Sequence, residues 1–556
     1  MKLDYKKIFF VGLAFFLITL FWQTYDSVIT KILIDKFGLN QFWSGIVMAM
    51  DNVLALFLIP LFGSISDKKN SKLGRRTPFI IVGTIIAAFA FVGLTFADNY
   101  QEAKIESQTT VVDQYTSIQD VELSYDDWRV IRDDIVFQWN VLLGQGVITP
   151  EKYLDFYQSV IDGDDSDDAT NITDYNYERD HREGINEILS MSGGTLSDED
   201  QTDLKDYFYL HLNERAWLVT SQSPATFIIF VVTLFIALVA MGTFRSPAVA
   251  LMPDVTIKPL RSKANAVINL MGTFGGILAI LLLKVYGLDK LSYVNYGPAF
   301  ITVGILMLVL LGIFLWKVRE PKLVKEREIL DKELGLTEEE EAHELHESVE
   351  ELSKDKRKSL FLILASVFLW FTGYNAVTTK LSDYAPKVLD LGFAMPLLIA
   401  QGAALVAFIP IGIIATKIGR RKTILIGIIL LTICFGSVYF LTPDTAGIMY
   451  VIFAMTGIAW ATINVNSYPM VVELAKGGNV GKYTGYYYAF SMAAQILTPI
   501  FSGFLMDTMS IHRKILFPYA AFFVLSSFVT MFFVKHGDAK IIKKDSIIEN
   551  FDVDMD

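Results

Sequence analysis

The 556-residue chain has a single cysteine, Cys434, so it cannot close an intramolecular disulfide bond. It has no phosphate-binding loop of the G-x-x-x-x-G-K-[ST] type, no cluster with metal-ligand spacing, and no arrangement of nucleophile and base. These absences argue against an enzyme, a nucleotide-driven pump, a catalytic residue, a metal site and a bound cofactor. Charged residues make up only 19% of the chain against 53% hydrophobic residues. This composition is a poor fit to a soluble globular domain.

Long apolar segments recur along the chain. A helix crosses the ~30 Å hydrocarbon core of a bilayer with about 20 residues, and twelve segments meet that length. Their predicted ranges are 8–33, 41–65, 79–97, 225–244, 264–286, 297–317, 359–380, 393–416, 422–441, 447–466, 483–506 and 515–534. The first follows Lys6 and Lys7 as a signal peptide would, but it is too long and has no small-residue cleavage site, so we expect it to be retained. The sequence predicts an all-α, multi-pass membrane protein.

Basic residues gather in short loops after the second, fourth and eighth predicted helices. They are Lys68, Lys69, Lys72, Arg75 and Arg76; Arg245, Lys258, Arg261 and Lys263; and Lys417, Arg420, Arg421 and Lys422. Because short loops rich in Lys and Arg stay in the cytoplasm, these loops and both termini are predicted to be cytoplasmic. The even number of helices agrees with this orientation, and we expect the protein in the plasma membrane.

The chain contains an internal repeat. "YDSVITK" (25–31) returns as "YNAVTTK" (374–380), and "IPLFGSISDKKNSKLGRRT" (59–77) returns as "IPIGIIATKIGRRKT" (409–423) with four residues deleted. "SPAVALMPD" (246–254) pairs loosely with "SYPMVVE" (467–473). The two members of this pair are closer along the chain than those of the first two pairs by roughly 125 residues, which is about the length of an acidic insert in the first half. The sequence therefore predicts two pseudo-symmetric six-helix bundles, one of which has gained an insert.

The predicted domains follow from this repeat. The N-terminal bundle takes 1–97 and 225–317, the insert 98–224, a cytoplasmic linker 318–358, the C-terminal bundle 359–534 and a cytoplasmic tail 535–556. The insert has 28 acidic and 8 basic residues and is predicted to be a small extracellular helical domain. Its "DGDDSDD" stretch (162–168) fits a solvated acidic loop better than a calcium loop, and Asn171 begins a possible glycosylation sequon. In the linker, the spacing of Thr337 and Glu340 predicts a capping box for an amphipathic helix, which we expect to join the halves rather than to regulate them.

Two carboxylates interrupt the predicted helices, Asp26 and Asp51. A charge at the centre of a membrane helix costs about 2.5–3.5 kcal/mol on insertion scales, so both should face the interior of the bundle. Their counterparts in the second half are the neutral amides Asn375 and Gln401. This asymmetry predicts a site that couples transport to a proton or a sodium ion. The alternative is that each aspartate pairs with a lysine, such as Lys31, Lys284 or Lys380, and only holds helices together.

Aromatic and amide side chains recur within the same apolar segments. The predicted cavity residues are Trp22, Gln23, Tyr25, Asn52, Asn265, Asn269, Tyr374, Asn375, Gln401, Trp460, Asn464, Tyr487 and Gln495. Aromatic faces together with amide donors and acceptors suit a sugar, although the tyrosines and tryptophans also suit helix packing.

"GSISDKKNSKLGRRTPFI" (63–80) resembles the signature after helix 2 of the major facilitator superfamily, in the longer form of its sucrose-transporter-like and glycoside-pentoside-hexuronide cation symporter branch. The loop "FRSPAVALMPDV" after helix 4 is similar to that of the sucrose-transporter group, and 412–421 has the ordinary superfamily spacing with Thr416 in place of the aspartate. The resemblance covers about 400 residues and the twelve helices. It implies the major facilitator fold and a cytoplasmic gate made of Gly63, Asp67, Gly74, Arg75, Arg76, Arg245, Asp254, Gly419, Arg420, Arg421 and Glu473.

The resemblance also bears on function. Plant sucrose carriers hold their coupling carboxylate in helix 4, but the fourth predicted helix has no acidic residue, so coupling must move to helix 1 or 2 or be absent. We predict cation-coupled import of a sugar or glycoside by alternating access, with a facilitator or exporter of another amphipathic solute as one alternative and a sensor that uses the insert as another. The expected partners are that solute and the lipid bilayer; we expect a monomer and no nucleic acid.

Overall fold

The structure is a computed structural model, and it describes residues 4–69, 71–106, 121–162, 184–190, 196–257, 260–333, 353–474, 480–509 and 512–537. Several sequence predictions lie outside these residues: all but the first residue of the acidic loop 162–168, the sequon at Asn171, Lys258 of the basic loop, the capping box of Thr337 and Glu340, and the cytoplasmic tail from residue 538 on. The described part of the chain contains helices and no strand. The prediction of an all-α protein is confirmed.

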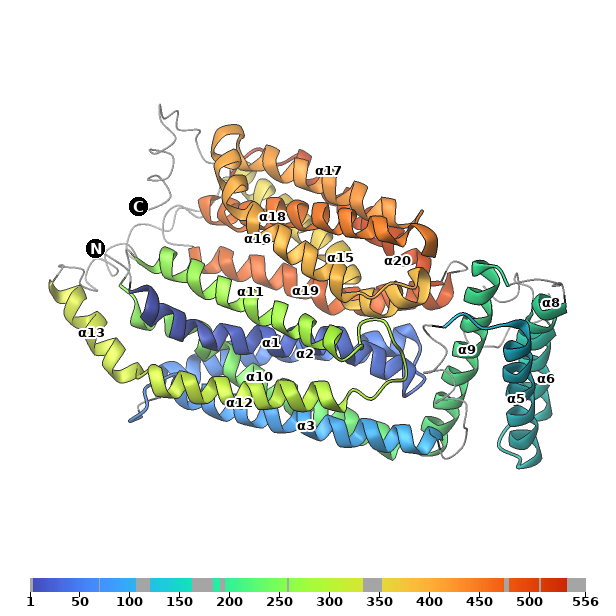
Figure 1. Cartoon of the computed structure of the whole chain (residues 1–556). Helices are drawn as coiled ribbons and strands as arrows, with labels where there is room; N and C mark the ends of the chain where they lie inside the picture. The colour runs from blue at the N-terminus through green and yellow to red at the C-terminus, as the bar shows by residue number, and fades with distance from the viewer. Residues whose placement is uncertain are drawn as a thin grey trace.

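Two groups of six long helices make up the bulk of the molecule (Figure 1). The first half consists of α1 (Tyr5–Asp35), α2 (Gln41–Lys68), α3 (Thr77–Glu106), α10 (Ala225–Val255), α11 (Arg261–Val285) and α12 (Gly297–Lys317). The second half consists of α15 (Lys354–Leu389), α16 (Ala394–Ile418), α17 (Arg420–Val438), α18 (Met449–Leu474), α19 (Val480–Thr508) and α20 (Leu516–Phe532).

The predicted number of membrane spans depends on how one bent helix is counted. Eleven helices of the described residues are long and apolar enough to cross a bilayer. The twelfth is α16, whose two parts, Ala394–Phe408 and Pro410–Ile418, meet at an angle of 52°. Pro410 explains the bend, because proline cannot donate the helical hydrogen bond and its ring clashes with the preceding turn.

The two halves touch most closely where glycines face backbone. A Cβ on Gly45 of α2 would lie 2.2 Å from the carbonyl oxygen of Pro499 in α19, and one on Gly503 of α19 would lie 2.3 Å from that of Gln41 in α2. Only glycine allows these backbones to approach so closely. The helices α2 and α19 therefore hold the halves together through two reciprocal glycine contacts.

The insert between α3 and α10 has a hydrophobic core of its own. Its helices are α5 (Tyr125–Gly144), α6 (Pro150–Phe156), η1 (Tyr157–Asp162), α8 (Ile185–Ser190) and α9 (Asp198–Gln222). Trp139 stacks on Phe156 with 3.9 Å between ring centroids, and its Nε1 donates to Nδ1 of the buried His211 at 2.7 Å. In Figure 1 these helices lie at one end of the bundle, opposite the end where α1 begins. We call these the insert end and the opposite end.

Helix α3 continues past the predicted boundary at residue 97. Its polar extension is held by the protein: Asp98 lies 3.5 Å from the Lys36 ammonium, and the Gln101 amide donates to the Lys36 carbonyl oxygen and to Thr220, both at 3.0 Å. The insert is thus tied to the first half where it begins and where it ends.

The predicted linker begins with a helix, before the position where the sequence predicted one. Helix α13 (Glu320–Glu333) follows α12 after two residues, and α15 begins at Lys354, before the predicted start at 359. The Ser353 hydroxyl accepts the backbone N–H of Lys356 and so caps α15.

Candidate functional site

Three charged side chains from different helices meet inside the first half. Asp26 of α1 and Asp51 of α2 interact electrostatically with each other and with the guanidinium of Arg245 in α10. Asn52 donates to the Asp51 carboxylate at 2.7 Å. We call Asp26, Asp51 and Arg245 the central charge cluster; each of the three side chains is half-buried.

An aromatic wall lines the cluster. The Arg245 guanidinium lies 5.7 Å from the ring centroid of Trp22, whose ring meets that of Tyr25 edge-on at 5.5 Å. Tyr25 is fully buried and donates its hydroxyl to the Met48 carbonyl oxygen at 3.2 Å. Tyr488 of α19 also interacts electrostatically with Arg245, so the second half reaches the cluster.

Polar contacts join the two halves beside the cluster. The Gln401 amide of α16 donates to Gln23 of α1 at 3.1 Å. The Thr30 hydroxyl donates to the Thr379 carbonyl oxygen of α15 at 3.4 Å. Asp26 lies one helical turn before Thr30, and its counterpart Asn375 lies one turn before Thr379. The structure therefore brings the two copies of the repeat together at the interface of the halves.

The other predicted cavity residues divide into two sets. Tyr374 stacks on Trp460 with 3.7 Å between centroids, and Tyr487 shares a 3.0 Å hydrogen bond with Ser467. Asn265, Asn269 and Asn464 are exposed and Gln495 is half-buried. No contact described for these last four residues links them to the central charge cluster, so their part in a cavity stays a prediction.

The lysines of the repeat do not pair with the two aspartates. Lys31 donates to the carbonyl oxygens of Leu288 and Leu291, at 3.0 and 2.6 Å. Lys380 donates to the backbone and side-chain oxygens of Gln41, at 3.1 and 2.9 Å, and to Ser44 at 3.0 Å. Both lysines are fully buried. The contacts described for Lys31 and Lys380 thus disagree with the alternative that they neutralise Asp26 and Asp51.

Lys380 belongs to a larger network at the insert end. Asp383, fully buried, accepts hydrogen bonds from Arg513 at 2.8 Å, from the Gln41 amide at 2.6 Å and from Lys387 at 2.5 Å. Lys387 also pairs with Asp35 of the first half at 2.8 Å.

Asp507 of α19 completes the network by accepting the backbone N–H groups of Gln41 and Phe42, at 3.0 and 2.6 Å. A carboxylate is favourable there because these are the first N–H groups of helix α2. We call the set Asp35, Gln41, Lys380, Asp383, Lys387, Asp507 and Arg513 the insert-end latch.

The predicted gate residues of the first half gather at the opposite end. Arg76 contacts Asp67 at 2.5 Å and Asp254 at 2.8 Å, and Arg75 lies 3.6 Å from Asp254. Burial lowers the pKa of the Arg76 guanidinium, but its hydrogen bonds to Asp254 and Asp67 outweigh burial and raise that pKa above its ordinary value. Gly63 faces Ser246 of α10, with 2.9 Å between its Cβ position and the hydroxyl oxygen.

Glu320 of α13 holds the segment that carries Arg75 and Arg76. Its carboxylate accepts the backbone N–H groups of Arg75, Arg76 and Thr77 at 2.7, 3.0 and 2.7 Å, and the Thr77 hydroxyl at 2.7 Å. Gly74 makes room for it, because a Cβ there would lie 2.2 Å from the carboxyl carbon, and its φ of 105° favours glycine.

Arg245 stands apart from the other gate residues of the first half. It precedes Asp254 by nine residues of α10, about 13–14 Å along the helix axis. The structure places its guanidinium in the central charge cluster instead, because a long side chain on a helix points back toward the helix N-terminus, here the insert end.

The predicted gate residues of the second half lie at the corresponding helix ends. Gly419 separates α16 from α17 with a φ of 93°, and Arg421 donates to the Phe532 carbonyl oxygen at the end of α20. Arg420 begins α17, and Glu473 lies in the last turn of α18. Across the described residues, no group of three or more His, Cys, Asp or Glu could hold a metal ion.

The family model for the Major Facilitator Superfamily matches residues 216–499 and 398–544, together more than half of the chain. The chain belongs to the major facilitator superfamily. A second family model of the superfamily, described as MFS/sugar transport protein, matches residues 10–112. The family prediction is confirmed, and with it the prediction of a transporter rather than an enzyme.

One curated superfamily relative is similar over a short stretch. The sucrose transport protein SUC4 of Arabidopsis thaliana is 31% identical over 98 residues, which is 16% of this chain and 19% of that protein. The matched stretch thus spans about a fifth of the length of that relative.

Solved structures of the superfamily match nearly the whole chain. The inward open xylose transporter XylE from E. coli has a TM-score of 0.54 at 16% identity, over 96% of this chain and 97% of that one. A D-xylose-proton symporter has a TM-score of 0.53 at 13% identity, over 95% and 98%. A bacterial homologue of ferroportin, in an inward-facing state, has 0.53 at 11%, over 96% and 99%. The predicted fold class is confirmed; at such identities the likeness shows the fold alone.

Sequence reasoning missed the insert-end latch and Tyr488. A signal for the latch was present in "KLSDYAPK" (380–387), where Lys380, Asp383 and Lys387 recur at helical spacing on one face. The run of three tyrosines that ends at Tyr488 was the only hint of a contact between α19 and the central charge cluster of this superfamily transporter.

Proposed function

We propose that this protein is a cation-coupled sugar transporter that works by alternating access. The central charge cluster is the observation that carries the proposal. Asp26 and Asp51 bring two negative charges to a site where Arg245 brings one positive charge. A proton or a sodium ion would balance the remaining charge.

The imbalance matters because of where the cluster lies. A charge in the middle of a membrane bundle is costly unless it is paired, so a cluster with an uneven count favours binding of a cation. The cation can then travel with the solute, since each stabilises the conformation that the other needs. Asp26 and Asp51 are the coupling residues of this proposal.

Aromatic rings and unsatisfied donors support a sugar as the solute. The indole Nε1 of Trp22 and the amide Nδ2 of Asn375 are buried without a hydrogen-bond partner. A buried donor left unsatisfied costs about 1–3 kcal/mol, which a sugar hydroxyl could offset by accepting its hydrogen bond. The Trp22 ring and the stacked pair of Tyr374 and Trp460 offer apolar faces to a sugar ring. The likeness of residues 10–112 to a sugar-transport model points the same way.

The conformation supports alternating access. The ion pairs described between the halves, Lys387 with Asp35 and Lys290 with Asp390, both lie at the insert end. The ion pairs of Arg75 and Arg76 at the opposite end stay within the first half. This conformation therefore has its insert end closed. With the predicted orientation, the insert is extracellular and both termini are cytoplasmic. In this proposal the protein is a monomer that imports its solute across the plasma membrane.

Proteoliposomes test the proposal. The wild-type protein should accumulate a pentose, a hexose or a glycoside when a proton or sodium gradient is imposed. Asp26→Asn and Asp51→Asn should each abolish uphill accumulation, because they remove the charge that the cation balances, while exchange of labelled for unlabelled sugar survives. Asp444→Asn is the matched control and should behave as wild type, because Asp444 is exposed in the short 3₁₀ helix η3 (Pro443–Ile448) between α17 and α18.

Accumulation that persists at the wild-type level in both variants would refute cation coupling at these aspartates. Sugar uptake that ignores both gradients in the wild-type protein would replace the symporter with a facilitator.

A further inference from the structure

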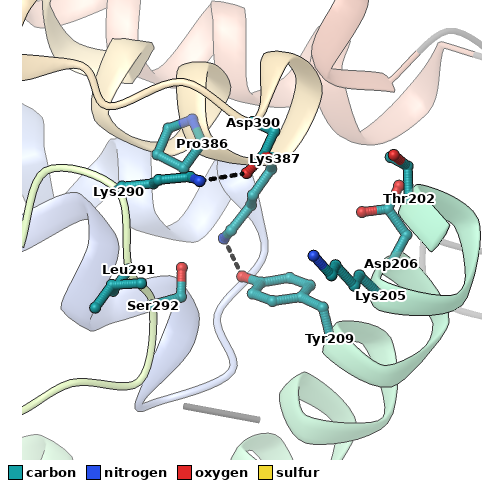
Figure 2. Close-up of a pocket in the computed structure, with 10 residues that line it drawn as sticks. All are labelled: Thr202, Lys205, Asp206, Tyr209, Lys290, Leu291, Ser292, Pro386, Lys387 and Asp390. Atoms are coloured by element: carbon teal, nitrogen blue, oxygen red, sulfur yellow. Dashed lines mark hydrogen bonds and ion pairs between the residues drawn. The ribbon is translucent and has the colours of Figure 1, made fainter. Parts of the chain in front are cut away.

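Tyr209 of the insert contacts both halves of the bundle. Its hydroxyl donates to the Asp35 carboxylate of the first half at 2.5 Å and accepts a hydrogen bond from Lys387 of the second half (Figure 2). The Lys387 ammonium lies 3.9 Å from the centroid of the Tyr209 ring, and the Arg513 guanidinium of the second half lies 5.8 Å from it. Tyr209 thus adds a side chain of the insert to the insert-end latch.

The insert is built onto the first half. A Cβ on Gly38, in the turn between α1 and α2, would lie 2.4 Å from the backbone nitrogen of Trp217 in α9. The Gln101 amide of α3 donates to the Thr220 hydroxyl of α9 at 3.0 Å. Tyr293, in the segment between α11 and α12, belongs to the hydrophobic core of the insert. Because these contacts come from three separate parts of the first half, α9 must move with that half when the halves separate.

We propose that the insert takes part in gating: Tyr209 is a positioning residue of the insert-end latch, which holds Lys387 against the first half in the closed state and keeps the Asp35 carboxylate hydrogen-bonded in the open state. The inference rests on the alternating access of the proposed function, and on neither its cation nor its sugar.

Opening of the insert end changes the contacts of Tyr209 unequally. Since Tyr209 moves with Asp35, the hydrogen bond between them persists in the open state. The hydrogen bond from Lys387 and the approach of Arg513 to the ring belong to the closed state alone. Contacts that exist in one state only shift the equilibrium toward that state, so Tyr209 favours the closed insert end.

Tyr209 also limits the cost of opening at Asp35. The Asp35 carboxylate is fully buried, and one of its oxygens, Oδ1, accepts hydrogen bonds from both Tyr209 and Lys387. A buried carboxylate that loses its donors carries a large desolvation cost. When Lys387 leaves with the second half, the Tyr209 hydroxyl remains as a donor to Asp35.

Single-thiol labelling of the full-length chain tests this role. Cys434, the only cysteine, is replaced by serine, Asn375→Cys is the reporter at the interface of the halves, and a membrane-impermeant thiol reagent is added on either side of the membrane. Tyr209→Phe removes the hydrogen bond to Lys387 but keeps the ring. Labelling from the insert side should become about tenfold faster, the change expected for a hydrogen bond to a charged group. Tyr209→Leu also removes the ring and should label faster still.

Labelling from the opposite side separates a shifted gate from a weakened fold. A shift toward the open insert end should leave that rate unchanged or lower it, whereas a loss of stability raises both rates. Tyr153→Phe is the matched control and should label as its parent, because Tyr153 stacks on Tyr157 within the insert, with 6.1 Å between centroids. Thermal unfolding shows which variants are folded, and Tyr209→Phe carries the test alone if Tyr209→Leu is not.

The outcomes separate this proposal from the proposed function. Faster labelling from the insert side alone supports the role of Tyr209, and in a protein that accumulates no sugar the same result overturns the proposed function only. Rates for the folded Tyr209 variants within threefold of their parent, or faster labelling from both sides, overturn the role of Tyr209 even in a protein that transports sugar. Unchanged labelling together with no transport overturns both.

Discussion

Replacing Lys387 with methionine should open the insert end of the bundle. The Lys387 ammonium is 7% exposed and pairs with Asp35 and Asp383, both fully buried. Methionine keeps most of the volume but removes the charge. Breaking a buried ion pair by removing one partner costs about 3–5 kcal/mol, and we expect the lower end because Asp383 keeps Arg513. At about 1.4 kcal/mol for each factor of ten, the equilibrium should move roughly 100-fold toward the open state.

A single thiol beneath the latch reports this shift. In the Cys434→Ser background, Asn375→Cys lies one helical turn beyond the contact of Thr379 with Thr30 that closes the interface. A membrane-impermeant thiol reagent added on the insert side should label this cysteine roughly 100-fold faster once Lys387→Met is added, until the chemistry itself limits the rate.

Lys322→Met is the control for this measurement. Lys322 and its partner Glu326 lie 3.8 Å apart with 73% and 43% of their side chains exposed, and such surface pairs contribute at most about 1 kcal/mol. The control should leave labelling unchanged. A rate for folded Lys387→Met within threefold of its parent would refute the view that the latch holds this end shut.

Three further predictions concern packing, charge and acid. Gly503→Ala should overpack the interface of α2 and α19 by about 1–3 kcal/mol and speed the same labelling, whereas Gly402→Ala, which has nothing within 4 Å, should not. Arg245→Gln should abolish the exchange of labelled for unlabelled sugar, and adding Asp51→Asn should restore part of that exchange, because it removes the negative charge that Arg245 balances. A double-mutant cycle of sugar binding should give a coupling energy of about 0.5–3 kcal/mol, and simple additivity would contradict the interaction of Arg245 with Asp51. Burial lowers the pKa of His211 to about 3, so the stability of the insert should be full above pH 6.5 and fall by about 2 kcal/mol at pH 5. Amide exchange in α5 and α9 measures this fall, and His211→Gln should remove it.

Hydropathy located the membrane spans but not the full helices. The prediction ended the third helix at residue 97, and α3 runs to Glu106; it ended the fourth at 244, and α10 runs to Val255. An apolar window detects only the part of a helix that meets lipid. The polar ends remain helical because folded partners satisfy them, as Lys36 does for Asp98, and those partners are distant in the sequence.

A residue of the site could be predicted from the sequence when its free-energy cost depends only on the residues next to it in the chain. A carboxylate within an apolar run is expensive wherever the rest of the chain lies, so Asp26 and Asp51 could be singled out from the sequence. Arg245 follows the end of an apolar run, where the free-energy cost of a charge is low. The sequence therefore favoured a loop at this position. The direction in which the Arg245 side chain points along α10 follows only once this position is known to be helical.

The latch contacts that join different parts of the chain could not be predicted, because they are tertiary. Asp35, Tyr209 and Lys387 come from the first half, the insert and the second half, and no periodicity links them. The repeat did mark Lys31 and Lys380 as equivalent, yet their carbonyl and amide partners lie at helix ends that only the fold brings near.

The anchoring of Glu320 has a mechanical consequence. Because three backbone N–H groups and a hydroxyl hold its carboxylate, α13 must rotate with the first half as one rigid arm. Its 14 residues extend about 21 Å, so a small tilt of that half sweeps the far tip through a much larger arc. A fluorophore on Asp331, near the end of α13, would therefore report a small rotation of the first half as a larger displacement.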